Sequence, residues 1–228
     1  MASRLAELQE TQNMIDGVEI DHLLLGVPEL GAGVRWIQDE FNIAAGKGGR
    51  HLGVGTHNAL VALGGRTYLE VIAPDPEQLV PKAALPYGLG ALSMPRLINW
   101  AVRVPDMDAW AAKLYQLGIP TQLKARDRVN PDGQRLTWRT AAMPATTFVN
   151  GADLTGLIPF AIDWQDTVHP SETAPTGIVL ESLSLCHPQI ALVQTTAAAL
   201  ELPVLVEQAE EPCLKAQVRS SLGVRRIQ

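Results

Sequence analysis

The chain contains two copies of one strand–turn–helix pattern, and this repeat limits the possible folds more than any other feature. Ile20–Val27 (IDHLLLGV) and Leu97–Val104 (LINWAVRV) are apolar runs of strand length, and each ends in Val-Pro. An acidic residue and an amphipathic helix follow in both copies. Alignment of the two Val-Pro pairs places Asn99 opposite His22. An internal repeat of this kind predicts two similar modules in tandem.

A hairpin is predicted downstream of the first copy. The two strands are Asn58–Gly64 and Arg66–Ala73, joined by Gly64-Gly65, which permits the positive φ angles of a tight turn. Glu70 lies within the second strand between apolar neighbours on its own face. A buried carboxylate costs several kcal/mol unless it is paired, hydrogen-bonded or bound to a cation. Glu70 therefore requires a partner.

These segments together resemble a known family. DHLLLGV, GGRH-x-G-x-GTHN, YLEVIAPDP and the later PFAIDW are similar to the glyoxalase-like family of the vicinal oxygen chelate superfamily. The resemblance implies an α+β fold of tandem βαβββ modules whose sheets curl around a concave site. It also implies metal ligands on the first and last strands of each module. His22 and Glu70 occupy these two places in the first module.

The resemblance also sets the expected domain boundaries. Residues 1–17 are expected to form a short helix or a frayed tail, and 18–176 a glyoxalase-like domain with modules at 18–76 and 97–165. Pro74–Met94 is expected to be an irregular crossover or lid. Residues 177–228 are predicted to be a C-terminal βαββ extension. Whether it completes a second sheet, shields an edge or forms a homodimer contact is open.

Composition argues against several kinds of partner. A net charge of −6 and a pI near 5.4 argue against nucleic acid, which requires a concentrated basic surface. The basic residues around Arg126 alternate with acidic ones, and we interpret them as a solvated hairpin rather than an anion site. No membrane-spanning run or secretory signal is seen. Two cysteines without a metal or disulfide pattern favour a cytoplasmic protein. The resemblance implies a small molecule as the partner.

His22 and Glu70 are candidate ligands of a divalent metal. Imidazole nitrogen and carboxylate oxygen suit Zn, Fe, Mn or Ni. Two ligands do not make a tight site, and the second module offers only Asn99 and, near the place of the glutamate, Phe160. The alternative is that His22 and Glu70 simply hydrogen-bond each other on the floor of the sheet.

Two further histidines flank a glycine-rich segment. His51 and His57 lie near the ends of Ile43–Gly55, which is predicted to be a loop. They are candidates for added metal ligands or for general acid and base beside Glu70, because imidazole exchanges protons near pH 7. The alternative is a pair of hydrogen-bonding fixtures. Asn58 is a candidate to orient a carbonyl or carboxylate of a ligand, or to cap a turn.

Aromatic and polar residues of the second module are candidate ligand contacts. Asp163 and Trp164 follow an apolar strand and are expected at the mouth of the cavity, with Asn99 opposite His22. Trp100 and Trp138 are expected to form flat walls, and the alternative is that the tryptophans belong to the core.

Two functions follow from these expectations. The first is a glyoxalase-like enzyme, a lyase, isomerase or dioxygenase acting on a small oxygenated organic molecule. His22 and Glu70 would bind a metal or polarise the substrate, and His57 would carry protons. The second is a metal-free protein that sequesters a small ligand in the same cavity. The fold alone does not decide between them.

Overall fold

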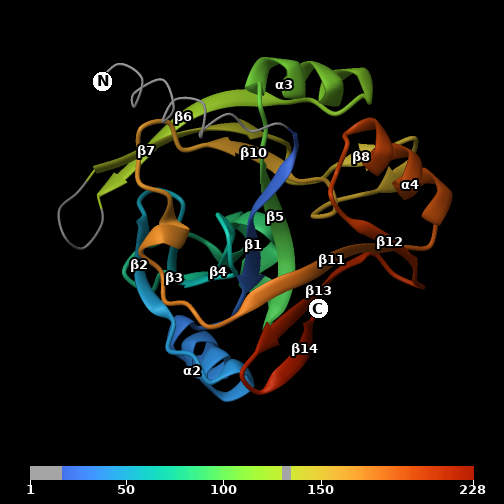
Figure 1. Ribbon diagram of the computed structural model, residues 1–228. Coiled ribbons are helices and arrows are strands. Elements are labelled where there is room, and N and C mark those ends of the chain that lie inside the picture. The colour runs from blue at the N-terminus through green and yellow to red at the C-terminus, as the bar shows by residue number, and fades with distance from the viewer. Residues whose placement is uncertain (1–16, 130–134) are drawn as a thin grey trace, which may run out of the picture.

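The computed structural model describes residues 17–129 and 135–228 (Figure 1). It is an α+β fold with two successive βαβββ modules, as the resemblance implies. The first module consists of β1 (Glu19–Gly26), α2 (Leu30–Phe41), β2 (Gly46–His51), β3 (Thr56–Ala62) and β4 (Tyr68–Pro74). The second consists of β5 (Arg96–Arg103), α3 (Met107–Gln116), β6 (Gln122–Val129), β7 (Arg135–Ala142) and β10 (Phe160–Asp163). The expected fold class is confirmed.

The two modules share one curled sheet of eight strands in the order β2-β3-β4-β1-β5-β10-β7-β6. Within each module the first and last strands are parallel, β1 with β4 and β5 with β10. The antiparallel pair β1–β5 joins the modules at the centre of the sheet (Figure 1). The two halves are therefore related by an approximate two-fold axis.

Strand register shows which residues occupy equivalent places in the two halves. Glu70 pairs with Leu24 of β1, and Phe160 pairs with Ala101 of β5. In the Val-Pro alignment Leu24 is equivalent to Ala101. Phe160 thus takes the place in the second module that Glu70 has in the first, in agreement with the sequence alignment.

The acidic residue after each Val-Pro begins a helix on the outer face of the sheet. Glu29 accepts hydrogen bonds from the first backbone amides of α2, and Asp106 does the same for α3. The buried stripe of α2, including Ile37 and Phe41, packs in one core with outward-facing strand residues such as Leu69. With one face occupied by this core, the concave face is left for a site.

The C-terminal residues form a sheet of their own, in the order β12-β11-β13-β14. Its elements are β11 (Val179–His187), α4 (Ile190–Ala199), β12 (Leu205–Gln208), β13 (Cys213–Ser220) and β14 (Gly223–Ile227). Leu183, Leu185 and Ala216 of this sheet lie in the same core as Trp100 of β5. The second sheet therefore packs on the large sheet. Strand β14 was not predicted.

The glycine-rich segment differs from its prediction as a loop. Gly46–His51 forms the edge strand β2, paired antiparallel with β3 and irregular between Lys47 and Arg50. Asn58 of β3 repairs this irregularity, because its Oδ1 accepts the Gly49 backbone N–H at 2.7 Å. The Asn58 side chain thus replaces a backbone hydrogen bond that is missing between β2 and β3. Strand propensity does not reveal such a contact.

The connections add only short elements. Strands β8 (Phe148–Val149) and β9 (Ala152–Asp153) form a small hairpin, and 3₁₀ helices span Lys82–Ala84, Pro86–Ala91 and Pro170–Glu172. The hairpin turn at Gly64-Gly65 has the predicted positive φ at both residues. Among the described residues no helix is long and apolar enough to cross a membrane.

Candidate functional site

The concave face of the large sheet holds a cavity with two joined compartments. The first, about 270 Å³, lies over the first module and contains Glu70 and His22. The second, about 250 Å³, lies over the second module and contains Asn99 and Thr140. Six residues line both: His51, Val54, Tyr87, Arg126, Trp138 and Phe160. A ligand longer than one compartment can therefore occupy both.

Glu70 is the central polar group of the first compartment. Its carboxylate is nearly buried, and Oε1 accepts a hydrogen bond from Asn58 Nδ2 at 2.6 Å. His51 Nε2 lies 3.7 Å from Oε1, and His22 Nε2 lies 3.6 Å from Oε2. No hydrogen bond from the described part of the chain reaches Oε2. One carboxylate oxygen is thus fixed, and the other is open to a ligand.

The orientation of Asn58 is set by the backbone of β2. Because Asn58 Oδ1 accepts from Gly49 N–H, its Nδ2 is turned towards Glu70. Gly48 makes this possible, since a Cβ atom at Gly48 would lie only 2.0 Å from Asn58 Oδ1. The glycines of this strand therefore position the carboxylate indirectly.

His22 is oriented by the residue that precedes it. The β1–β5 pairing is irregular between Ile20 and His22, so Asp21 falls at a β-bulge. The bulge lets neighbouring side chains meet, and His22 Nδ1 lies 2.6 Å from Asp21 Oδ1. The Tyr68 ring stacks on the imidazole at 4.6 Å. Nδ1–H is thus donated to Asp21, and Nε2 is directed at Glu70.

Asp21 is a fully buried carboxylate with four side-chain donors. Besides His22 it accepts from His169 Nε2 at 3.0 Å, Arg103 at 3.1 Å and Trp164 Nε1 at 3.3 Å. Burial alone would raise the pKa of Asp21, but the hydrogen bonds and charges of His169 and His22 outweigh it and hold the pKa well below its usual range. Asp21 therefore stays ionised and fixes the tautomer of His22.

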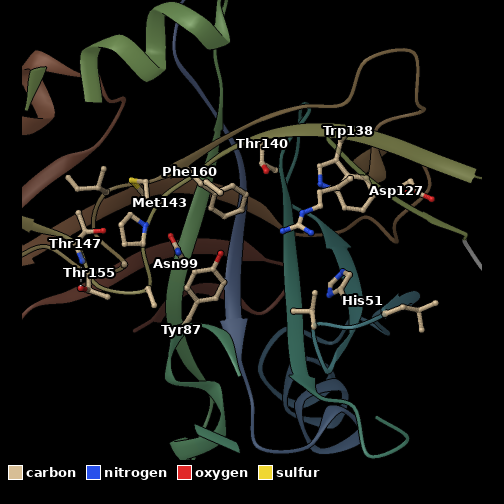
Figure 2. A pocket seen from close by; sticks show the side chains of 18 residues that line it. His51, Tyr87, Asn99, Asp127, Trp138, Thr140, Met143, Thr147, Thr155 and Phe160 are labelled. Carbon is tan, nitrogen blue, oxygen red and sulfur yellow. Dashed lines mark hydrogen bonds between the residues drawn. The ribbon is translucent and has the colours of Figure 1, made fainter. Parts of the chain in front are cut away.

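Aromatic rings line the walls of the cavity (Figure 2). In Figure 2, Tyr87, Asn99 and Phe160 group near the middle, with His51 and Trp138 on one side. Burial, with a smaller contribution from the charge of Glu70, raises the pKa of Tyr87 to about 12. Its phenol is therefore protonated at neutral pH and can donate a hydrogen bond. Tyr87 has φ of 56°, a strained conformation typical of functional positions.

The structure brings together most of the residues that the sequence singled out. His22, His51, Asn58 and Glu70 meet in the first compartment, and Trp164 lines it while bonding Asp21. Asn99 lies in the second compartment.

His57 is not part of this cluster. It neighbours Asn58 in β3, and successive side chains of a strand point to opposite faces. Asn58 faces the cavity, so His57 faces away, and its Nε2 is buried without a hydrogen-bond partner in the described residues. The structure therefore contradicts a position for His57 beside Glu70.

Trp100 and Asp163 also lie away from the cavity, contrary to expectation. Trp100 is fully buried in the core between the sheets, and its Nε1 donates to the Leu157 carbonyl at 2.9 Å. It alternates with Asn99, which takes the cavity face. Asp163 accepts the Gln165 backbone N–H at 2.9 Å and lines neither compartment.

Comparison with known proteins agrees with this architecture. A family model described as a glyoxalase-like domain matches residues 20–201. The chain belongs to the glyoxalase-like family. This is a family of the vicinal oxygen chelate superfamily, and the match covers both modules and reaches α4.

Solved structures that are similar to this glyoxalase-like chain have low sequence identity to it. A hypothetical protein from Staphylococcus aureus has a TM-score of 0.65 at 12% identity, covering 92% of this chain and 99% of its own. Methylmalonyl-CoA epimerase from Mycobacterium tuberculosis has a TM-score of 0.36 at 22% identity, covering 55% and 79%. Methylmalonyl-CoA epimerase from Streptomyces coelicolor has a TM-score of 0.43 at 19% identity, covering 68% of this chain and 100% of its own. The first likeness shows the fold alone, and the epimerase scores are too low to support an argument. No curated protein matches the chain.

The donor set of this glyoxalase-like chain does not fit the metal centre that the resemblance implied. His22 and Glu70 face each other, but the equivalent positions in the second module carry Asn99 and Phe160. In residues 17–129 and 135–228, no group of three or more His, Cys, Asp or Glu side chains is placed to hold a metal ion.

Sequence reasoning missed Asp21, His169, Tyr87 and Arg126. Asp21 had a signal, since it is an acidic residue inside an apolar strand directly before His22. The other three lie on connections or on an exposed hairpin, and their positions depend on tertiary structure.

Proposed function

We propose that this glyoxalase-like chain is an enzyme of the lyase or isomerase type, with Glu70 as its general base. It would remove a proton from a carbon atom next to a carbonyl group of a small oxygenated molecule. The observation that carries the proposal is the geometry of Glu70, a nearly buried carboxylate with one oxygen held by Asn58 and Oε2 open to the cavity.

This geometry suits proton abstraction from carbon. A base must reach the proton it removes at hydrogen-bond distance, and Oε2 is free to do so. When the C–H bond breaks, its electron pair moves onto the carbonyl oxygen and forms an enolate. The proton passes to Oε2 of Glu70, so no oxidant is required. Return of the proton to the same or a neighbouring carbon gives exchange or isomerisation.

The residues around Glu70 support this step. Tyr87 has a protonated phenol at the cavity wall, and a donor there would stabilise the enolate oxygen. His51 Nε2, on the other side of the carboxylate, is placed to exchange a proton with the substrate. His22 Nε2 faces Oε2 and is positioned by Asp21 rather than by the ligand.

A second candidate is a ligand-sequestering protein without catalysis. The aromatic walls formed by Tyr87, Trp138 and Phe160 favour binding of a flat organic molecule. A cavity used for binding alone gains little from a buried Glu70, because such a carboxylate costs free energy to desolvate. The enzyme is therefore the stronger proposal, and the metal implied by the resemblance takes no part in it.

Deuterium exchange tests the proposal without knowledge of the product. Small 2-oxo acids and hydroxyketones are incubated with the protein in D₂O, and loss of the proton signal next to the carbonyl is followed by NMR. We expect exchange with wild type and its loss in Glu70→Gln. Glu172→Gln, an exposed glutamate on a 3₁₀ helix, is the matched control. Equal exchange in Glu70→Gln and wild type would remove Glu70 as the base. Binding of these compounds without exchange in wild type and in both variants would favour the sequestering protein.

A further inference from the structure

The second module holds a counterpart of each group around Glu70. Asn58 pairs with Ile72 in the first module, and Thr140 pairs with Ile162 in the second. Because Ile162 lies two residues after Phe160, as Ile72 lies two after Glu70, Thr140 is the counterpart of Asn58.

The same register extends to the outer strands. His51 of β2 pairs with Thr56, two residues before Asn58. Arg126 of β6 pairs with Trp138, two residues before Thr140. Arg126 is therefore the counterpart of His51. The second half replaces His22, Glu70, Asn58 and His51 by Asn99, Phe160, Thr140 and Arg126. This half has a compartment of its own but no carboxylate at the place of Glu70.

The polar groups of this half are mainly hydrogen-bond donors. Asn99 is 5% exposed, and its Oδ1 accepts the Trp100 backbone N–H at 2.7 Å, which leaves the Nδ2 donors for the cavity. No partner in the described residues bonds that Nδ2. Arg126 lines both compartments, its side chain is exposed, and no carboxylate of the described residues forms an ion pair with it. The one carboxylate among the described residues that line this compartment, that of Asp127, already forms an ion pair with Arg135 at 3.0 Å. Asn99 and Arg126 thus offer donors and a positive charge to a ligand.

We propose that the second compartment binds the non-reacting part of the substrate, a planar body that carries a carboxylate. Arg126 would pair with the carboxylate at the junction of the compartments, and Asn99 Nδ2 would donate to an oxygen of the same molecule. A single guanidinium presents two parallel N–H donors that match one carboxylate. Trp138 and Phe160 provide ring faces for the planar body. Arg126 is exposed, as expected for a solvated hairpin, and the proposal adds a ligand contact for its side chain.

This inference deepens the proposed function and assigns its substrate to organic acids. The first module supplies the base. The second supplies the residues that hold the molecule while the carbon atom next to its carbonyl group lies beside Glu70. Arg126 also offsets the negative charge that would otherwise repel an acid from Glu70 and from a chain of net charge −6.

Binding of two matched probes tests the inference independently of catalysis. Benzoate and benzamide are nearly the same shape and differ in charge, and their dissociation constants are measured by ligand-observed NMR. We expect wild type to prefer benzoate and Arg126→Gln to weaken the binding of benzoate by about 2- to 5-fold, the usual effect of an ion pair with an exposed guanidinium. The dissociation constant of benzamide should change little. Arg139→Gln, on the same sheet but outside both compartments, is the control.

Two further variants separate this inference from the proposed function. Asn99→Asp keeps the oxygen that accepts from Trp100 and places a second carboxylate in the compartment, so benzoate should bind more weakly than to wild type. Glu70→Gln should bind benzoate at least as well as wild type, although it should lose exchange. Equal affinity for the two probes, no benzoate binding to wild type, or equal effects of Arg126→Gln and Arg139→Gln would overturn the inference. Retained exchange in Glu70→Gln would overturn only the proposed function.

Discussion

Replacement of Asp21 by asparagine should strongly destabilise the fold, with a defined dependence on pH. Asp21 is fully buried and accepts from His22, His169, Arg103 and Trp164. An asparagine of the same shape keeps one oxygen and turns an amide donor towards groups that are themselves donors.

The size of the destabilisation depends on the side chains that lose the negative charge of Asp21 as their partner. Loss of one member of a buried ion pair costs about 3–5 kcal/mol. Arg103 keeps a second partner, because its NH2 donates to Glu19 at 2.8 Å. We therefore expect Asp21→Asn to lower the free energy of unfolding by about 3 kcal/mol at pH 7, at the low end of that range.

The pH dependence follows from the depressed pKa of Asp21. A carboxyl group whose pKa is lower in the folded state stabilises the fold above its unfolded pKa, about 3.9. That contribution is lost as the pH falls towards the folded pKa. The difference between wild type and Asp21→Asn should therefore be constant from about pH 5 to 8 and should shrink below about pH 4.

Urea unfolding followed by tryptophan fluorescence measures this difference at each pH. Asp166→Asn removes an exposed carboxylate near the same site and should stay within about 0.5 kcal/mol of wild type. A loss below about 1 kcal/mol in Asp21→Asn, or a difference that grows as the pH falls, would refute the account of Asp21 as an ionised centre.

Three further predictions concern single side chains. Gly48→Ala should reduce the exchange rate by displacing Asn58, since the alanine Cβ would lie 2.0 Å from Asn58 Oδ1. Exchange rates from NMR, compared with thermal stability, would show whether the loss of exchange is larger than unfolding explains. Tyr87→Phe should slow exchange by about 10- to 1,000-fold through loss of one oxyanion donor. Because the Tyr87 pKa is raised to about 12, the wild-type rate should show no phenol titration up to pH 10. Native alkylation followed by mass spectrometry should modify half-exposed Cys213 before Cys186, whose pKa burial raises to about 11.

The repeat and the strand alternation predicted much of the fold from the sequence. The repeated Val-Pro segments located β1 and β5, and alternation placed Glu70 on the same face as Tyr68 and Ile72, the face that lines the cavity in the structure. These predictions succeed because they depend on local periodicity and on a pattern that occurs twice. The same alternation, applied to β3, separates His57 from Asn58, so two adjacent polar residues could not both face the site.

The remaining parts of the site depend on tertiary contacts. Asp21 and His22 meet because of a bulge, which interrupts the alternation that sequence patterns assume. His169 reaches Asp21 from a connection 148 residues away in the chain, and no local pattern predicts such a contact. Strand β2 depends on the side chain of Asn58 and the absence of a side chain at Gly48.

In the proposed reaction, Glu70 moves a proton while other residues hold the substrate. The most direct test is the rate of deuterium incorporation at saturating substrate in wild type and Glu70→Gln, with the dissociation constant measured on the same samples. We expect a loss of about 10²- to 10⁴-fold in rate, typical of a general base, with affinity unchanged or improved. An unchanged rate in Glu70→Gln at saturation would contradict it.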